Sequence, residues 1–149
     1  MLRIENVDFS YGASKILFEL SMLAKEGSVT CILGRNGVGK STLLKTIMGI
    51  EKSNSGDILL NDLKIQKYTP AQRARNGIAY VPQGREIFPL LTVEENLQTG
   101  YSVLKRNDRV ISDEIYELFP ILKDMKNRRG GDLSGGQQQQ LAIARALVT

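Results

Sequence analysis

Histidine is absent from the 149 residues of this chain. Its absence removes the side chain that most often serves as a general base and as a zinc ligand, so any chemistry must rest on other groups. Cysteine occurs once, as Cys31, which excludes an internal disulfide and agrees with a reducing compartment. Because Cys31 lies within the apolar run 29–33, we expect it to be a core residue and not a reactive thiol.

Long apolar runs are missing as well. No stretch approaches the ~20 apolar residues of a membrane-spanning helix, since charges such as Glu19 and Arg145 interrupt the candidates. The first residues, Met1 to Glu5, lack the apolar segment of a signal peptide. If the protein works at a membrane, we therefore expect other chains to supply the span.

The charge balance is mildly basic, with 20 Lys and Arg against 16 Asp and Glu. Apolar residues make up 42% and charged residues 24%, an ordinary balance for one globular domain with a core. A loose basic cluster, Lys123, Lys126, Arg128 and Arg129, predicts a solvated surface, and an anionic partner such as nucleic acid or a membrane is the alternative. No aromatic residue is interleaved with this cluster, which argues against a nucleic-acid groove.

Strand and helix patterns alternate along the chain. Apolar residues arranged as in strands occupy 2–9, 16–23, 28–33, 58–60 and 78–81. Helical patterns with capping or terminating residues occupy 40–48, 70–76, 92–104, 112–120 and 134 to the end. This alternation predicts an α/β fold with a mainly parallel core sheet, an N-terminal antiparallel β layer and a helical region after residue 92.

A glycine-rich segment separates the strand pattern 28–33 from the helix pattern 40–48. It matches G-x-x-x-x-G-K-[ST] at every fixed position and consists of Gly34, Arg35, Asn36, Gly37, Val38, Gly39, Lys40 and Ser41, followed by Thr42. Glycines let backbone N–H groups wrap a phosphate, and the helix start adds its positive dipole end. Lys40 adds a charge for the β- and γ-phosphates, and the Ser41 hydroxyl is a ligand for Mg²⁺. The sequence therefore predicts a nucleotide-phosphate site.

A second glycine motif, Leu133-Ser134-Gly135-Gly136-Gln137, opens the last helical pattern. A serine N-cap followed by two glycines leaves free N–H groups at a positive helix end, which is a second anion site on physical grounds. This motif resembles the signature of the ATP-binding-cassette (ABC) ATPases. With the phosphate motif upstream, the whole given chain is similar to that family.

The resemblance implies a role for the second motif in a pair of cassettes. ABC cassettes pair head to tail, and each signature closes over the nucleotide of its partner. The residues that would make this contact are Ser134, Gly135, Gly136 and Gln137. The expected partners are a second ATPase subunit and transmembrane permease subunits, with no nucleic acid. The expected location is the cytoplasmic face of the inner membrane, as a peripheral protein.

Two further positions match the family. Tyr11 falls where an aromatic ring stacks on adenine. Gln83 follows the strand pattern 78–81 and resembles the Q-loop glutamine, which reaches Mg²⁺ and the attacking water. The resemblance thus implies ATP and Mg²⁺ as cofactors, catalytic roles for Lys40 and Gln83, and a metal site at Ser41 and Gln83.

The sequence lacks two elements that the family places after the signature, an apolar strand ending in Asp-Glu and a loop with a histidine. Asp113-Glu114 opens a polar helix pattern upstream of the signature and is no substitute. We expect a cassette that is incomplete at its C-terminus, with a core at about 1–91, a helical subdomain at about 92–131 and the signature segment at 132–149. By resemblance the enzyme class is a transport-coupled ATPase. Without the catalytic glutamate, a non-hydrolytic ATP-binding module is the alternative.

The segment from Tyr80 to Leu97, YVPQGREIFPLLTVEENL, is informative about the kind of cassette. It looks like the bacterial ATPases that energise uptake of branched-chain amino acids and of urea or amides. Residues 34–40 and 130–133 look most like the E-type ATPase of urea transporters. A soluble ABC protein acting on DNA or ribosomes is a third reading, which this segment disfavours. Since the ATPase does not touch the solute, the choice between urea and amino acids stays open.

Overall fold

The computed structural model describes residues 1–148, with the backbone alone at residue 103. The chain divides into two compact units, Met1–Asn76 and Gly77–Thr149. Within the described part, none of the helices combines the length and apolar character needed to span a bilayer. The division lies inside the predicted core segment, and the boundaries predicted near 91 and 131 stay predictions.

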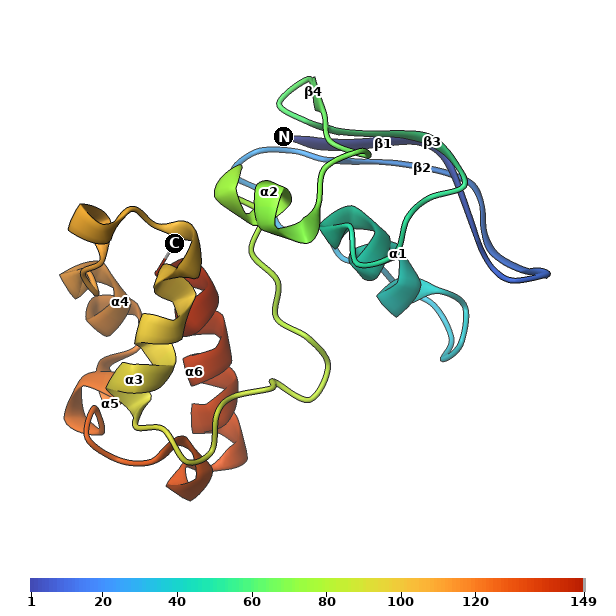
Figure 1. Ribbon diagram of the computed structural model, residues 1–149. Helices are drawn as coiled ribbons and strands as arrows, with labels where there is room; N and C mark the ends of the chain where they lie inside the picture. The colour runs from blue at the N-terminus through green and yellow to red at the C-terminus, as the bar shows by residue number, and fades with distance from the viewer. Residues whose placement is uncertain (149) are drawn as a thin grey trace. The chain divides into compact units, whose positions relative to one another are not determined.

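The sheet of the first unit is antiparallel throughout (Figure 1). β1 (Leu2–Tyr11) pairs with β2 (Ser14–Ala24) and with β3 (Ser55–Leu60), and β3 pairs with the short β4 (Leu63–Lys64). The strand order is therefore β2-β1-β3-β4. Gly12 in the short β1–β2 turn has a φ of 55°, the left-handed conformation that tight hairpin turns require. The predicted N-terminal antiparallel layer is confirmed.

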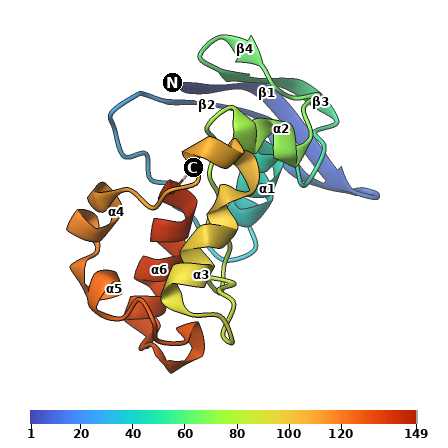
Figure 2. The same cartoon turned by 60° about the vertical axis from the view of Figure 1, so that its left-hand side comes forward.

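Two helices, α1 (Lys40–Met48) and α2 (Pro70–Arg75), lie on the same side of this sheet (Figures 1 and 2). Helix α1 ends at Gly49, whose φ of 77° lets the chain turn while its N–H donates to the Thr46 carbonyl at 3.1 Å. The buried apolar side chains of the unit come from the sheet, from α1 and from the segment after β4: Ile4, Val7, Phe9, Leu17, Ile58, Leu59, Leu43, Ile47 and Ile65. These elements place the start of α1 against the sheet.

Two predicted parallel strands differ from what the structure shows. Residues 28–33 and 78–81 form no strand, and no pair of strands in residues 1–148 is parallel. Val29 and Leu33 are 92% and 90% exposed, and Cys31 is exposed where we expected a core residue. A strand forms only against a hydrogen-bonded neighbour, and the described sheet pairs with neither segment. The apolar composition of these segments predicted burial, but burial also requires a neighbouring element for them to pack against.

The second unit is helical. Its elements are α3 (Val93–Gln98), η1 (Thr99–Val103), η2 (Arg106–Asp108), α4 (Asp113–Leu118), α5 (Pro120–Asp124), η3 (Gly130–Asp132) and α6 (Gly135–Leu147). Their apolar side chains form one core, which contains Val93, Leu97, Ile115, Leu122, Leu133, Leu141, Ala144 and Val148. The helices predicted at 92–104, 112–120 and from 134 onward are confirmed, although the first changes from α to 3₁₀ after Gln98.

Asn96 on α3 is completely buried and holds the loop that precedes this helix. Its side-chain oxygen accepts from the Phe88 N–H at 2.8 Å. Its amide nitrogen lies 2.9, 3.1 and 2.9 Å from the carbonyl oxygens of Phe88, Leu91 and Thr92. One side chain thus replaces the backbone pairing that this irregular loop lacks.

The charged features noted in the sequence lie at the surface of this unit. The basic cluster of Lys123, Lys126, Arg128 and Arg129 is exposed, as predicted for a solvated surface. Asp113 and Glu114 are exposed in the first turn of α4, where acidic side chains favour the helix dipole. Their position agrees with a structural role for this acidic pair.

Candidate functional site

The glycine loop of the first unit turns the chain into α1 with a backbone that only glycine adopts readily. Gly37 and Gly39 have φ values of 84° and 100°. A Cβ on Gly39 would also lie 2.9 Å from Cγ2 of Ile16 on β2. Substitution at Gly39 would therefore strain the backbone and push the loop away from the sheet.

Lys40 folds back over this loop. Its Nζ donates to the carbonyl oxygens of Gly34 at 2.8 Å and of Arg35 at 2.6 Å. An ammonium group has three N–H bonds, so one donor is left for an anion. Gly39 at the N-cap offers no side-chain hydrogen bond, which leaves the first N–H groups of α1 open at its positive end. The loop can therefore receive a phosphate group.

Tyr11 is tied to the same part of the sheet as the loop. The residue is 45% exposed, its ring meets the Phe9 ring edge to face with centroids 4.7 Å apart, and its hydroxyl donates to Glu51 at 3.0 Å. Phe9 pairs across the sheet with Leu17, and Leu17 Cδ2 lies 3.3 Å from where a Cβ on Gly39 would stand. The structure thus connects the predicted adenine-stacking residue to the predicted phosphate loop through two packed side chains.

The second motif opens α6 with the capping box that its spacing predicts. Ser134 Oγ accepts from the Gln137 N–H at 3.3 Å, and Gln137 Oε1 accepts from the Ser134 N–H at 2.8 Å. Ser134, Gly135 and Gly136 are exposed, and a Cβ on Gly136 would meet no atom within 4 Å. The positive end of this helix is open to an anion.

Gln83 is exposed in the loop before α3, and the residues after it have an unusual backbone. Gly84, Arg85 and Glu86 have φ values of 87°, 69° and 48°. For the two non-glycine residues this left-handed conformation costs about 1–2 kcal/mol each. Such strain persists only where other contacts hold the chain.

Those contacts come from Arg145 on α6. It donates to the carbonyl oxygens of Glu86 at 2.9 Å and of Arg85 at 3.3 Å, and its guanidinium carbon lies 5.6 Å from the Phe88 ring centroid. Burial lowers the pKa of Arg145, and the Glu86 carboxylate opposes that shift. In the sequence, Arg145 stands out only as a charge that interrupts an apolar run, and this isolation was the one available signal for its role.

A second arginine, Arg73 on α2, was also missed. It is 2% exposed, and burial lowers its pKa. Its guanidinium donates to four carbonyl oxygens, those of Thr46 and Ile47 at 2.7 Å, Gln66 at 3.0 Å and Tyr68 at 3.2 Å. Arg73 therefore caps the C-terminal end of the helix that begins at the glycine loop.

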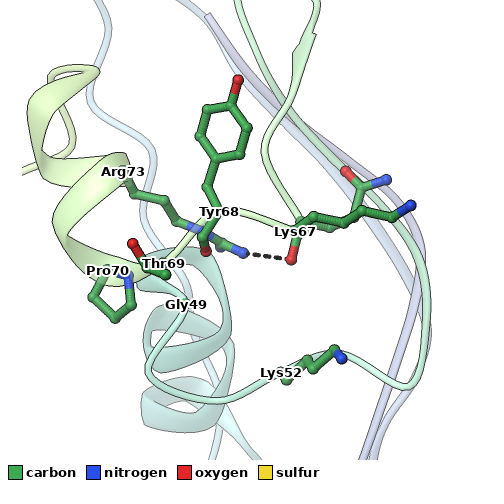
Figure 3. A pocket seen from close by; sticks show the side chains of 8 residues that line it. Gly49, Lys52, Lys67, Tyr68, Thr69, Pro70 and Arg73 are labelled. Atoms are coloured by element: carbon green, nitrogen blue, oxygen red, sulfur yellow. Dashed lines mark hydrogen bonds between the residues drawn. The ribbon is translucent and has the colours of Figure 1, made fainter.

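The Arg73 side chain forms part of the wall of a surface pocket of about 520 Å³ (Figure 3). The close view shows Arg73 reaching from α2 toward the loop that carries Tyr68, beside Gly49. A Cβ on Gly49 would lie 2.8 Å from Arg73 Nε, so glycine is needed there for space as well as for its positive φ. The sequence indicated Gly49 only as a helix end.

The predicted metal site is only partly built by one unit. Ser41 is exposed in the first turn of α1, whereas Gln83 belongs to the other unit, so their joint role stays a prediction. In the described part of the chain, no three His, Cys, Asp or Glu side chains form a group that could hold a metal ion.

The fold is that of the P-loop NTPases, the class defined by a glycine loop that opens a helix. The model of the ABC transporter family matches residues 17–149. The chain belongs to this family, whose ATPases bind ATP. The identification agrees with the resemblance carried by the two glycine motifs.

Several relatives match almost the full length of the chain. It is 42% identical to the probable branched-chain amino acid transport ATP-binding protein LivF of Archaeoglobus fulgidus, over 99% of this chain and 63% of that protein. It is 41% identical to the high-affinity branched-chain amino acid transport ATP-binding protein BraG of Pseudomonas aeruginosa, over 100% of this chain and 64% of the relative. The chain thus spans less than two thirds of these relatives.

Solved structures of similar fold agree with this family assignment. A nucleotide-free ATP-binding cassette from an ABC transporter superposes with a TM-score of 0.85 at 32% identity, covering 99% of this chain and 64% of that one. A bacterial ABC transporter cassette solved as a dimer gives a TM-score of 0.82 at 28% identity, covering 99% of this chain and 69% of that one.

Proposed function

We propose that this chain is the nucleotide-binding part of an ABC importer ATPase, which couples ATP binding and hydrolysis to uptake of branched-chain amino acids or a related small solute such as urea. The observation that carries the proposal is the glycine loop that opens α1 with Lys40 folded across it. The names of the relatives from Archaeoglobus and Pseudomonas support branched-chain amino acids as the solute. The urea reading rests on the sequence resemblance alone.

In this proposal the residues of the first unit hold Mg-ATP. The N–H groups of the segment Gly34 to Thr42 and the ammonium of Lys40 bind the phosphates, and the exposed face of Tyr11 stacks on adenine. Ser41 and Gln83 are the residues that would hold Mg²⁺, which would supply neutralisation of phosphate charge when bound. The free donor of Lys40 and the open N-terminal end of α1 support this fit.

The open end of α6 serves a second ATPase subunit. Ser134 to Gln137 would contact the γ-phosphate of the nucleotide that the partner holds, in a head-to-tail pair. The similar bacterial cassette that was solved as a dimer supports a pairing of two cassettes. Permease subunits would supply the membrane span, with this subunit at the cytoplasmic face of the inner membrane. The exposed segment after Gln83 is where we propose that they bind; no nucleic-acid partner is proposed.

Lys40→Ala tests the proposal in the protein as its cell produces it. Loss of the charge-assisted bond costs about 2–3 kcal/mol, so ATP should bind about 30- to 150-fold more weakly in equilibrium titration. Lys45→Ala, at the other end of α1, is the matched control and should bind like the wild type. Equal ATP affinity in the wild type and Lys40→Ala would remove our account of the loop. Uptake of leucine and of urea by cells with each variant then identifies the solute.

A further inference from the structure

The loop that follows Gln83 is attached to both ends of α6. Near the C-terminal end of this helix, Arg145 binds the backbone carbonyls of Arg85 and Glu86 at 3.3 and 2.9 Å. Its guanidinium also lies over the Phe88 ring, 5.6 Å from the centroid. One side chain therefore fixes the backbone and the following aromatic residue together.

The side chain of Arg85 then runs back toward the start of α6. Its Nη1 donates to Gln138 Oε1 at 3.1 Å, in the first turns of the helix. Its Nη2 lies 3.4 Å from where a Cβ on Gly135 would stand, so the guanidinium lies beside the exposed glycine next to Ser134. Gln138 in turn donates to the Gly130 carbonyl at 3.3 Å. The loop is thus joined to the residues that open the helix.

The loop needs these attachments because its own backbone is unfavourable. Gly84, Arg85 and Glu86 are all left-handed, and only glycine adopts that conformation freely. Within the loop, Arg85 and Glu86 make short-range bonds to the carbonyls of Pro82 and Gly84 at 3.2 and 2.8 Å. If Arg145 released the two carbonyls, the loop would relax toward ordinary backbone angles.

We propose that Arg145 and Arg85 are positioning residues that couple the loop of Gln83 to the signature at the start of α6. A displacement of the loop is carried through the Arg145 bonds to the body of the helix and through Arg85 and Gln138 to Ser134. This inference rests on the proposed function, in which Gln83 and Ser134 act on bound nucleotide. Neither arginine is among the residues proposed to bind nucleotide, so both are expected to act on turnover and not on ATP affinity.

The test measures steady-state ATP hydrolysis by the protein as its cell produces it. Arg145→Ala should lower kcat at least tenfold while KM for ATP changes less than twofold, and Arg145→Lys should recover part of kcat because one ammonium can reach one carbonyl. Arg128→Ala, an exposed arginine of the same unit, is the control and should match the wild type. Wild-type kcat in Arg145→Ala would overturn the inference.

A second pair of variants keeps the test decisive if Arg145→Ala fails to fold. Arg85→Ala and Gln138→Ala both remove the hydrogen bond between these two side chains, and Gln138→Ala also removes the bond to the Gly130 carbonyl, so each should lower kcat and the double variant should lower it no further than Gln138→Ala alone. Multiplicative effects in the double variant would contradict the coupling.

A wild type that binds no ATP would overturn the proposed function instead. Hydrogen exchange then tests the inference alone: the Arg85 and Glu86 amides should exchange faster in Arg145→Ala, and unchanged exchange would overturn it.

Discussion

The two units differ in how the segment that carries each glycine motif is packed. In Gly77–Thr149 the helices close a core in which Val93, Leu97 and Leu122 have no exposed surface. In Met1–Asn76 the segment that leads into the glycine loop carries the nearly fully exposed side chains of Val29 and Leu33. The signature helix therefore packs into a closed apolar core, whereas the glycine loop follows a segment whose apolar side chains are exposed.

Each unit contains an arginine whose side chain binds backbone carbonyl oxygens. Arg73 in the first unit binds four carbonyl oxygens and is almost completely buried. Arg145 in the second unit binds two and is half-buried. We therefore expect Arg73 to matter mainly for stability and Arg145 mainly for the loop that it holds.

The largest effect that would sharpen this comparison is expected from Arg73→Met. Methionine fills similar space but leaves buried carbonyl oxygens at the end of α1 without donors, which costs about 3 kcal/mol of unfolding free energy. Urea denaturation of the protein as its cell produces it measures the loss. Arg75 on the same helix is exposed, so Arg75→Met is the control and should change the unfolding free energy by less than about 0.5 kcal/mol. Equal stability of the two variants would show that Arg73 does not anchor α1.

A smaller effect is expected where the two units share the same device, a capping box. Ser134 is the N-cap of α6 and Thr69 is the N-cap of α2. Ser134→Ala and Thr69→Ala should each lower the unfolding free energy by about 1 kcal/mol. Only Ser134→Ala should also lower ATP hydrolysis, because only that cap faces nucleotide in the proposed pair. A similar fall in turnover for Thr69→Ala would mean that lost stability, not a lost contact, explains both variants.

The smallest effect concerns acid and the sheet of the first unit. A hydrogen bond from Lys15 at 2.7 Å, with others from the Glu19 N–H and Ser55, lowers the pKa of Asp8 from 3.8 to about 2. Because the folded pKa is the lower one, this stabilisation is complete above about pH 4 and is lost as the pH falls toward 2. The urea midpoint of the wild type should fall toward that of Asp8→Asn over this range. A gap between the two that stays constant down to pH 2 would contradict the assignment.

Local signals in the sequence predicted the local structure well. The glycine after Met48, the capping box of Thr92 and Glu95 and that of Ser134 and Gln137 all lie where their spacing placed them. Each depends on contacts within a few residues of chain, so a single sequence contains the whole cause. The same holds for the glycine loop, whose backbone angles need glycine at fixed positions.

What the sequence could not predict depends on distant partners. The strand patterns at 28–33 and 78–81 require a neighbouring strand, which composition does not reveal. The four acceptors of Arg73 come from two segments on either side of β3 and β4. Arg145 meets a loop 59 and 60 positions away in the chain. The sequence position of an arginine does not by itself show whether its side chain is buried or which carbonyl oxygens accept its hydrogen bonds.

The hydrogen bonds of Asn96 also define what deamidation at this one position would do to the loop before α3. Deamidation would replace its amide nitrogen, the donor to the carbonyls of Phe88 and Leu91, by an oxygen that can only accept when ionised. Acceptors would then face acceptors inside a buried site, at a cost that the unmodified chain does not bear. A stored sample that loses this nitrogen would keep its amino-acid order, with one position changed, and yet lose the bonds that shape the loop before α3.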